Sequence, residues 1–124
     1  MTAGENRIDI AFVAGDEALN RNDDFLYSLF VPARAHLTFP CFDQPDLKAR
    51  YSLVLDVPAA WQAVGNGAEV GRDENGGRAR VRFAETAPLP TYLFGFVAGR
   101  FSVEHATRNG RELRMFHRET NGET

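Results

Sequence analysis

Cys41 is the only thiol in the sequence and the first candidate for nucleophilic chemistry. It stands within FPCFDQPDLKA, residues 39–49. A catalytic thiol needs a nearby base and a lowered pKa, whereas Phe39, Pro40 and Phe42 give apolar surroundings that raise the pKa of a thiol. Free cysteine is also among the most frequently buried residue types. We therefore expect Cys41 to be mostly buried, as a core residue in a rigid corner of the chain.

The three histidines, His36, His105 and His117, are the candidate metal ligands. Asn109-Gly110 is typical of a two-residue hairpin turn. In the register that this turn sets, His105 and His117 point to opposite faces of the hairpin. His36 belongs to a different segment, and no H-E-x-x-H pair occurs in the sequence. We expect no metal site built by this chain.

The clustered charges also have structural interpretations. Asp43 and Asp46 flank Pro45, and we expect them to accept hydrogen bonds from their own backbone amides and so fix the turn into the next strand. The arginines of RARVRF, residues 78–83, alternate with apolar residues as on a strand with one solvated face. The glycine-rich pieces GNG and GRDENGG lack the strand and helix context of a phosphate loop. The sequence thus predicts no self-contained active site.

Strands must position these residues, because apolar and polar positions alternate with a period of two along most of the chain. No amphipathic helix longer than two turns is indicated, residues 15–24 are predicted to be a loop, and residues near 36 could form one helical turn. Residues 91–97 are apolar on both faces and are expected in the middle of a sheet. We predict an all-β fold, an antiparallel β-sandwich or curved saddle-like sheet, in one domain spanning 1–124. The predicted strands are residues 8–12, 26–31, 51–57 and 78–85, glycine-broken pieces between 63 and 73, and a pair flanking Asn109-Gly110.

The composition is that of an ordinary globular domain. The 124 residues are 44% hydrophobic and carry a formal net charge of -3, with no run of like charges. This charge argues against a nucleic-acid partner or an anionic membrane. No apolar run approaches the roughly 20 residues of a membrane span, the start lacks the pattern of a signal peptide, and a single cysteine forms no internal disulfide. We expect a cytoplasmic protein.

Two blocks of sequence resemble the N-terminal β domain of the aminopeptidase N family of zinc metallopeptidases. The first block, PARAHLTFPCFDQPDLKA, resembles the family pattern A-R-x-x-F-P-C-F-D-E/Q-P-x-x-K-A. The second, FAETAPLPTYLFGFVAGRF, resembles F-x-x-T-x-P-x-x-T-Y-L-x-x-F-x-x-G-x-F. The resemblance extends from about Phe25 to Phe101. The residues that carry its structural motif are Phe39, Pro40, Cys41, Asp43, Pro45 and Tyr92.

The resemblance implies an architectural role for these blocks. In the family, zinc and the general base belong to a catalytic domain with H-E-x-x-H, and a G-x-M-E-N strand holds the amine of the peptide substrate. This chain contains neither motif. The resemblance therefore implies a partial, truncated N-terminal domain that has no catalytic residue, no metal ligand and no cofactor of its own. Its partner would be the zinc-bearing catalytic domain of the parent, through which it would meet peptide substrates.

The chain departs from the family at positions that reach the substrate end of the cleft. Counted back from Phe39, the family's Gln or Glu pair falls on Leu29 and Val31, and the arginine of A-R falls on His36. Leu29 and Val31 could line a side-chain pocket but could not pair with an ammonium group. The alternative functions are a free-standing β-sandwich binding module and a structural interaction domain. For a truncated domain we also expect exposed strand edges that promote self-association.

Overall fold

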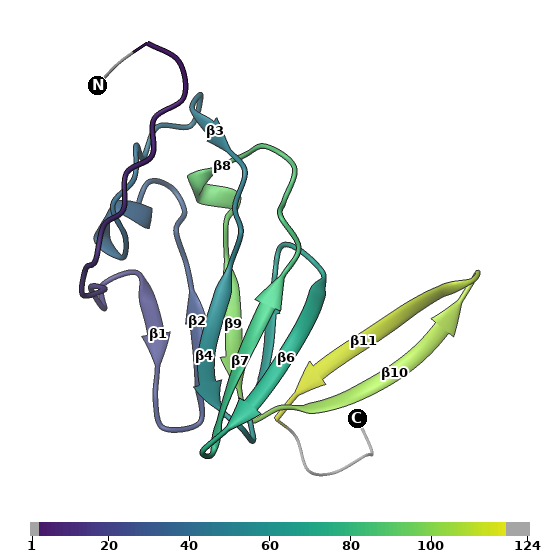
Figure 1. The fold of residues 1–124 in the computed structure, drawn as a ribbon. Coiled ribbons are helices and arrows are strands. Elements are labelled where there is room, and N and C mark those ends of the chain that lie inside the picture. Colours follow the sequence, from purple (N-terminus) through teal and green to yellow (C-terminus); the bar gives the residue numbers. More distant parts are fainter. Residues whose placement is uncertain (1–2, 119–124) are drawn as a thin grey trace.

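The computed structural model describes residues 3–118 and consists mainly of antiparallel strands (Figure 1). A four-stranded sheet has the order β1-β2-β9-β5. Strand β9 pairs with β2 on one side and β5 on the other. The mid-sheet position predicted for residues 91–97 is therefore right only from Phe96 onward, because residues 91–93 form a 3₁₀ turn. The bounds of these strands are β1 Leu19–Arg21, β2 Phe25–Ser28, β5 Gln62–Gly65 and β9 Phe96–Gly99.

A three-stranded sheet, in the order β4-β7-β6, forms the second layer. Its strands are β4 Val54–Pro58, β6 Glu69–Asn75 and β7 Arg78–Phe83. In the central strand β7, Ala79, Val81 and Phe83 are buried and the intervening arginines are exposed, as the alternation predicts. Gly76 and Gly77, both with positive φ, form the β6–β7 turn at the ENGG sequence. This turn makes β6 and β7 an antiparallel hairpin.

The two sheets pack against each other through one hydrophobic cluster. The three-stranded sheet contributes Val57, Ala79, Val81 and Phe83, and the four-stranded sheet contributes Ala63 and Ala98. Val81 is completely buried, and burying a side chain of this size stabilises the fold by about 1.5–3 kcal/mol. The molecule is therefore an antiparallel β-sandwich, which confirms the predicted fold class.

A second hydrophobic cluster lies beside the first and is rich in aromatic rings. Its buried members are Ala18, Phe30, Ala35 and Phe94. Two 3₁₀ turns border it, η1 Ala35–Leu37 and η2 Thr91–Leu93. A short pairing of β3 (Lys48–Ala49) with β8 (Leu89–Pro90) joins the segments that carry the two sequence blocks.

The last described strands, β10 (Ser102–Arg108) and β11 (Arg111–His117), form a hairpin that projects from the sandwich (Figure 1). Asn109 and Gly110 are its two turn residues, with φ of 53° and 75°. His105 lies opposite Arg114 and His117 opposite Ser102, as the predicted register requires. No helix among residues 3–118 is long and apolar enough to cross a membrane.

The predicted strand at residues 8–12 is wrong. This segment is extended but forms no strand, and Ile8, Ile10 and Phe12 are 67%, 57% and 53% exposed. An alternating sequence becomes a strand only when a neighbouring edge supplies backbone hydrogen bonds, and no described strand pairs with this segment. The predicted loop 15–24 also contains the short strand β1, which pairs with β2.

Candidate functional site

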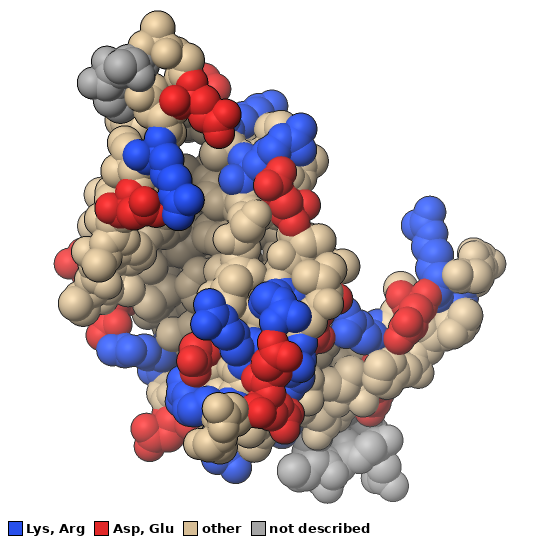
Figure 2. Space-filling view, in the orientation of Figure 1, with Lys and Arg blue, Asp and Glu red and all other residues tan. Residues whose placement is uncertain are grey.

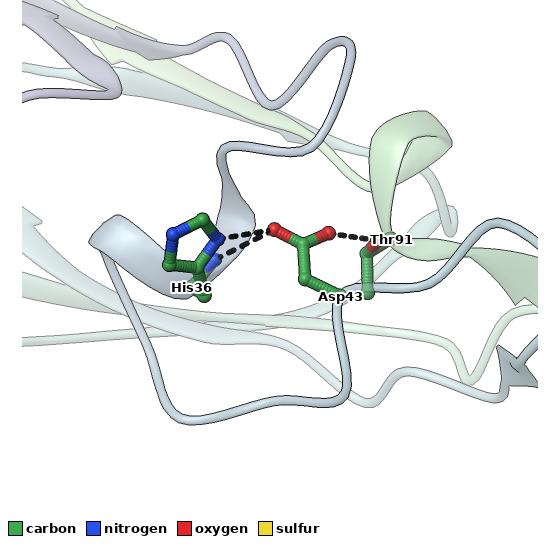
Figure 3. Close-up of polar contacts among 3 residues, drawn as sticks. All are labelled: His36, Asp43 and Thr91. Atoms are coloured by element: carbon green, nitrogen blue, oxygen red, sulfur yellow. Dashed lines mark hydrogen bonds and ion pairs between the residues drawn. The ribbon is translucent and has the colours of Figure 1, made fainter.

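Asp43 is the centre of a polar site that joins two segments far apart in the sequence (Figure 3). Its Oδ2 lies 2.7 Å from Nδ1 of His36 and accepts a hydrogen bond of 3.1 Å from the His36 backbone N–H. Its Oδ1 accepts a hydrogen bond of 2.5 Å from Oγ1 of Thr91. The carboxylate thus connects the two 3₁₀ turns, η1 through His36 and η2 through Thr91.

Local structure explains why these groups meet. The amide N–H groups at the start of a short helical turn have no partner within the turn, and the Asp43 carboxylate accepts one of them from His36. Thr91 begins η2 directly after the β3–β8 pairing has brought the two sequence blocks together. The site is therefore a product of the fold around FPCFDQP.

The Asp43 side chain is only 8% exposed, although the imidazole of His36 is 54% exposed. Burial acts to raise the pKa of the Asp43 carboxyl, but the hydrogen bonds from Thr91 and His36 outweigh it and hold the pKa below its usual range. Asp43 is therefore a charged, fully engaged carboxylate. It is suited to fixing the corner and lacks the raised pKa of a general acid.

This geometry corrects the sequence analysis. Asp43 was expected to accept hydrogen bonds from its own turn, whereas its partners are His36 and Thr91, 7 and 48 positions away. Identifying Thr91 would have required knowing that β3 pairs with β8. The sequence signal for this contact is that Asp43 belongs to one of the two blocks and Thr91 to the other.

Cys41 packs at the margin of the aromatic cluster and is partly buried. The rings of Tyr51 and Phe94 stack beside it with centroids 4.2 Å apart, and Phe39 packs edge-on against Phe94 at 5.8 Å. Burial, assisted by the negative charge of Asp43, raises the pKa of the Cys41 thiol. A raised pKa disfavours the thiolate that nucleophilic catalysis requires.

The histidines lie beside single carboxylates at separate places in the fold. Nδ1 of His105 lies 3.1 Å from Glu112, and Nε2 of His117 lies 3.1 Å from Glu104. Within residues 3–118, no group of three or more His, Cys, Asp or Glu side chains could hold a metal ion. The donor set of these residues therefore does not fit a zinc site, which takes three or four converging ligands.

The other predicted site residues are not gathered into one place. Leu29 and Val31, which follow β2, are 47% and 51% exposed, so their side chains are available for contact. Phe39 packs on the aromatic cluster, whereas Pro40 and Pro45 are exposed. Tyr92 is 36% exposed and lies in η2 beside Thr91.

An antiparallel β-sandwich in which the Asp43 carboxylate links two 3₁₀ turns defines an all-β domain. Residues 17–93 match the family model of the peptidase M1 N-terminal domain. The chain belongs to this family.

Relatives in several kingdoms carry a similar segment. The chain is 37% identical over 90 residues to "Probable M1 family aminopeptidase 1" of Encephalitozoon cuniculi, covering 70% of this chain and 10% of that protein. It is 34% identical over 98 residues to human "Aminopeptidase Q", covering 75% of this chain and 10% of that protein. The chain thus spans about a tenth of the length of these curated relatives.

A solved structure shares the fold. The M1 zinc metallopeptidase from Deinococcus radiodurans superimposes with a TM-score of 0.65 at 26% identity, over 76% of this chain and 21% of that chain. The match to a family member confirms the resemblance seen in the two sequence blocks.

Proposed function

We propose that this domain packs on the zinc-bearing peptidase domain of an M1 aminopeptidase. In this position it forms part of the wall of the peptidase cleft and contributes no catalytic group. The relatives that it resembles are about ten times longer than the matched segment, and their names identify aminopeptidases. The donor set of residues 3–118 does not fit zinc, so in this proposal the metal and the contacts that orient a peptide belong to the peptidase domain.

The observation that carries the proposal is the outward row formed by Leu29 and Val31. Both are about half exposed, although Phe30 between them is only 1% exposed. In the proposal, these two side chains form part of a larger apolar surface that contacts the partner. Leu29 and Val31 occupy the positions that the family resemblance assigns to the substrate end of the cleft, so we propose that they offer apolar surface there.

The shape and charge of the surface support a docked partner. Figure 2 shows acidic and basic residues interspersed over the visible face, with an uncharged hollow between the N-terminal segment and the region of β4. The strand β4 is an edge of its sheet, and its Val54 is 46% exposed. In the isolated domain, such edges would favour self-association, which we propose as a consequence of the missing partner.

Binding to a peptidase domain tests the proposal directly. The 124-residue chain is mixed with a separately produced M1 zinc peptidase domain, and complex formation is measured by native mass spectrometry and sedimentation. Leu29→Asp and Val31→Asp should weaken the complex, because each places a charge in an apolar contact. Val70→Asp is the matched control, since Val70 is 63% exposed on β6.

The outcomes separate this proposal from its alternative. A complex that is lost with the Leu29 and Val31 variants, and kept with the Val70 variant, supports docking through this row. A chain that stays monomeric beside the peptidase domain would favour a free-standing binding module.

We also propose a cytoplasmic location, because the lone Cys41 thiol has no partner for a disulfide in this chain. Cell fractionation checks this location.

A further inference from the structure

The projecting hairpin leaves the four-stranded sheet just beyond the end of β9 (Figure 1). Two adjoining hollows are lined by residues of this region. The first, of about 370 Å³, is lined by polar and apolar atoms in similar amounts and is called the polar hollow because Asp24 and Arg100 line it. The second, of about 340 Å³, is almost entirely apolar and is called the apolar hollow. Phe101 and Arg118 line both, so the hollows form one continuous surface. The polar hollow is completed by Asp24, Arg100 and Ser102, and the apolar one by Phe25, Tyr27, Ser28 and Val97.

The polar hollow contains more positive than negative charge. Nε of Arg100 and Nη2 of Arg118 each lie 3.7 Å from an oxygen of Asp24. Two guanidinium groups and one carboxylate give a formal charge of +1. Both distances exceed the 2.7–3.2 Å of ordinary N–H···O hydrogen bonds. The guanidinium groups can therefore accommodate a second carboxylate, for which their planar geometry is suited.

The apolar hollow presents aromatic surface directly beside these charges. The rings of Phe25 and Tyr27 are stacked with centroids 6.0 Å apart, and Val97 pairs with Tyr27 on the neighbouring strand. The guanidinium carbon of Arg118 lies 4.6 Å from the centre of the Phe25 ring. This cation–π contact holds the charged group at the boundary between the two hollows.

We propose that the two hollows together bind a carboxylate that carries an aromatic or aliphatic apolar group. The carboxylate contacts Arg118 and Arg100, and the apolar group lies on Phe25 and Tyr27. The C-terminus of a peptide and a fatty acid share this chemistry. The inference rests on residues apart from the Leu29–Val31 row, so it stands whether or not the domain docks on a peptidase domain.

The experiment is a titration of the isotope-labelled 124-residue chain, followed by backbone amide NMR shifts. The probes are N-acetyl-phenylalanine, its uncharged amide, acetate and octanoate. We expect saturable shifts of residues 25–27 and 100–102 with N-acetyl-phenylalanine or octanoate, and the tighter of the two identifies the source of the carboxylate. The amide lacks the charge and acetate lacks the apolar group, so each should bind at least about tenfold more weakly.

Charge-removing variants locate the site. Arg118→Gln and Arg100→Gln should each weaken binding by about tenfold, while Arg108→Gln, at the exposed tip of the same hairpin, should leave it unchanged. The spectra of the free variants report whether the fold is intact. Absence of saturable shifts with both apolar carboxylates, equal binding of the amide, or equal loss with Arg108→Gln would overturn the proposal.

Discussion

Asp43 and Thr91 are 48 positions apart in the sequence and are joined by a hydrogen bond of 2.5 Å between Oδ1 and Oγ1. Each residue belongs to one of the two blocks that resemble the M1 family. The second oxygen of Asp43 holds His36 through both its ring and its backbone N–H. One buried carboxylate therefore fixes the corner of the chain that contains Cys41.

Replacing Asp43 should destabilise the domain. Asp43→Asn removes the charge that accepts three hydrogen bonds in a site where the side chain is only 8% exposed. We expect the free energy of unfolding to fall by about 1–3 kcal/mol, the usual range for losing hydrogen bonds to a charged, buried group. Urea denaturation measures this cost. The exposed Asp46→Asn is the control, and an equal effect of both variants would contradict the role of Asp43 as the link between the turns.

The stability of the domain should depend on the ionisation of Asp43. Its pKa is lower in the folded state than the value of about 3.9 for an unfolded aspartate. The contribution of Asp43 to stability is therefore complete above the unfolded pKa and is lost as the pH falls through the folded pKa. Below about pH 4 the wild type should lose more unfolding free energy than Asp43→Asn. The measurement is the free energy of unfolding of both proteins between about pH 7 and acid conditions. If it fell equally in both, the ionisation of Asp43 would make no contribution to stability.

The Cys41 thiol should react slowly in the folded protein. Burial and the nearby Asp43 carboxylate raise its pKa, so the reactive thiolate is scarce near neutral pH. Labelling with a thiol reagent should be slow in buffer and fast in denaturant. Cys41→Ala should cost about 1 kcal/mol, as expected for a small cavity at a partly buried position. Rapid labelling of the native protein would refute the assignment of Cys41 to a packed corner.

The projecting hairpin should depend on its turn residues. Asn109 and Gly110 both have positive φ. Residues other than glycine and asparagine adopt this backbone conformation only at a cost in free energy. Gly110→Val should reduce hydrogen-exchange protection in β10 and β11 while leaving protection in the buried strand β7 unchanged. The neighbouring Arg111→Val keeps the turn residues and is the control. Unchanged protection of β10 and β11 in Gly110→Val would contradict the turn assignment.

The sequence was informative wherever a local pattern determined the structure. The alternation in β7 predicted which side chains are buried, and Asn109-Gly110 predicted the register of the hairpin. Prediction from the sequence failed where residues far along the chain determine whether a segment forms a strand or which partner a side chain contacts. Residues 8–12 have a strand pattern but no strand of the described chain pairs with them, and Asp43 reaches Thr91 only through the β3–β8 pairing.

The central claim is that this domain has no catalytic centre of its own and acts beside a zinc-bearing peptidase domain. The most direct test is an assay of the purified 124-residue chain on aminoacyl chromogenic substrates with added zinc, together with metal analysis. The account predicts no turnover above buffer and no stoichiometric zinc, because within residues 3–118 no further ligands converge on His36, His105 or His117. Chelator-sensitive turnover that co-purifies with the chain, and is lost on replacing any of these histidines, would contradict it.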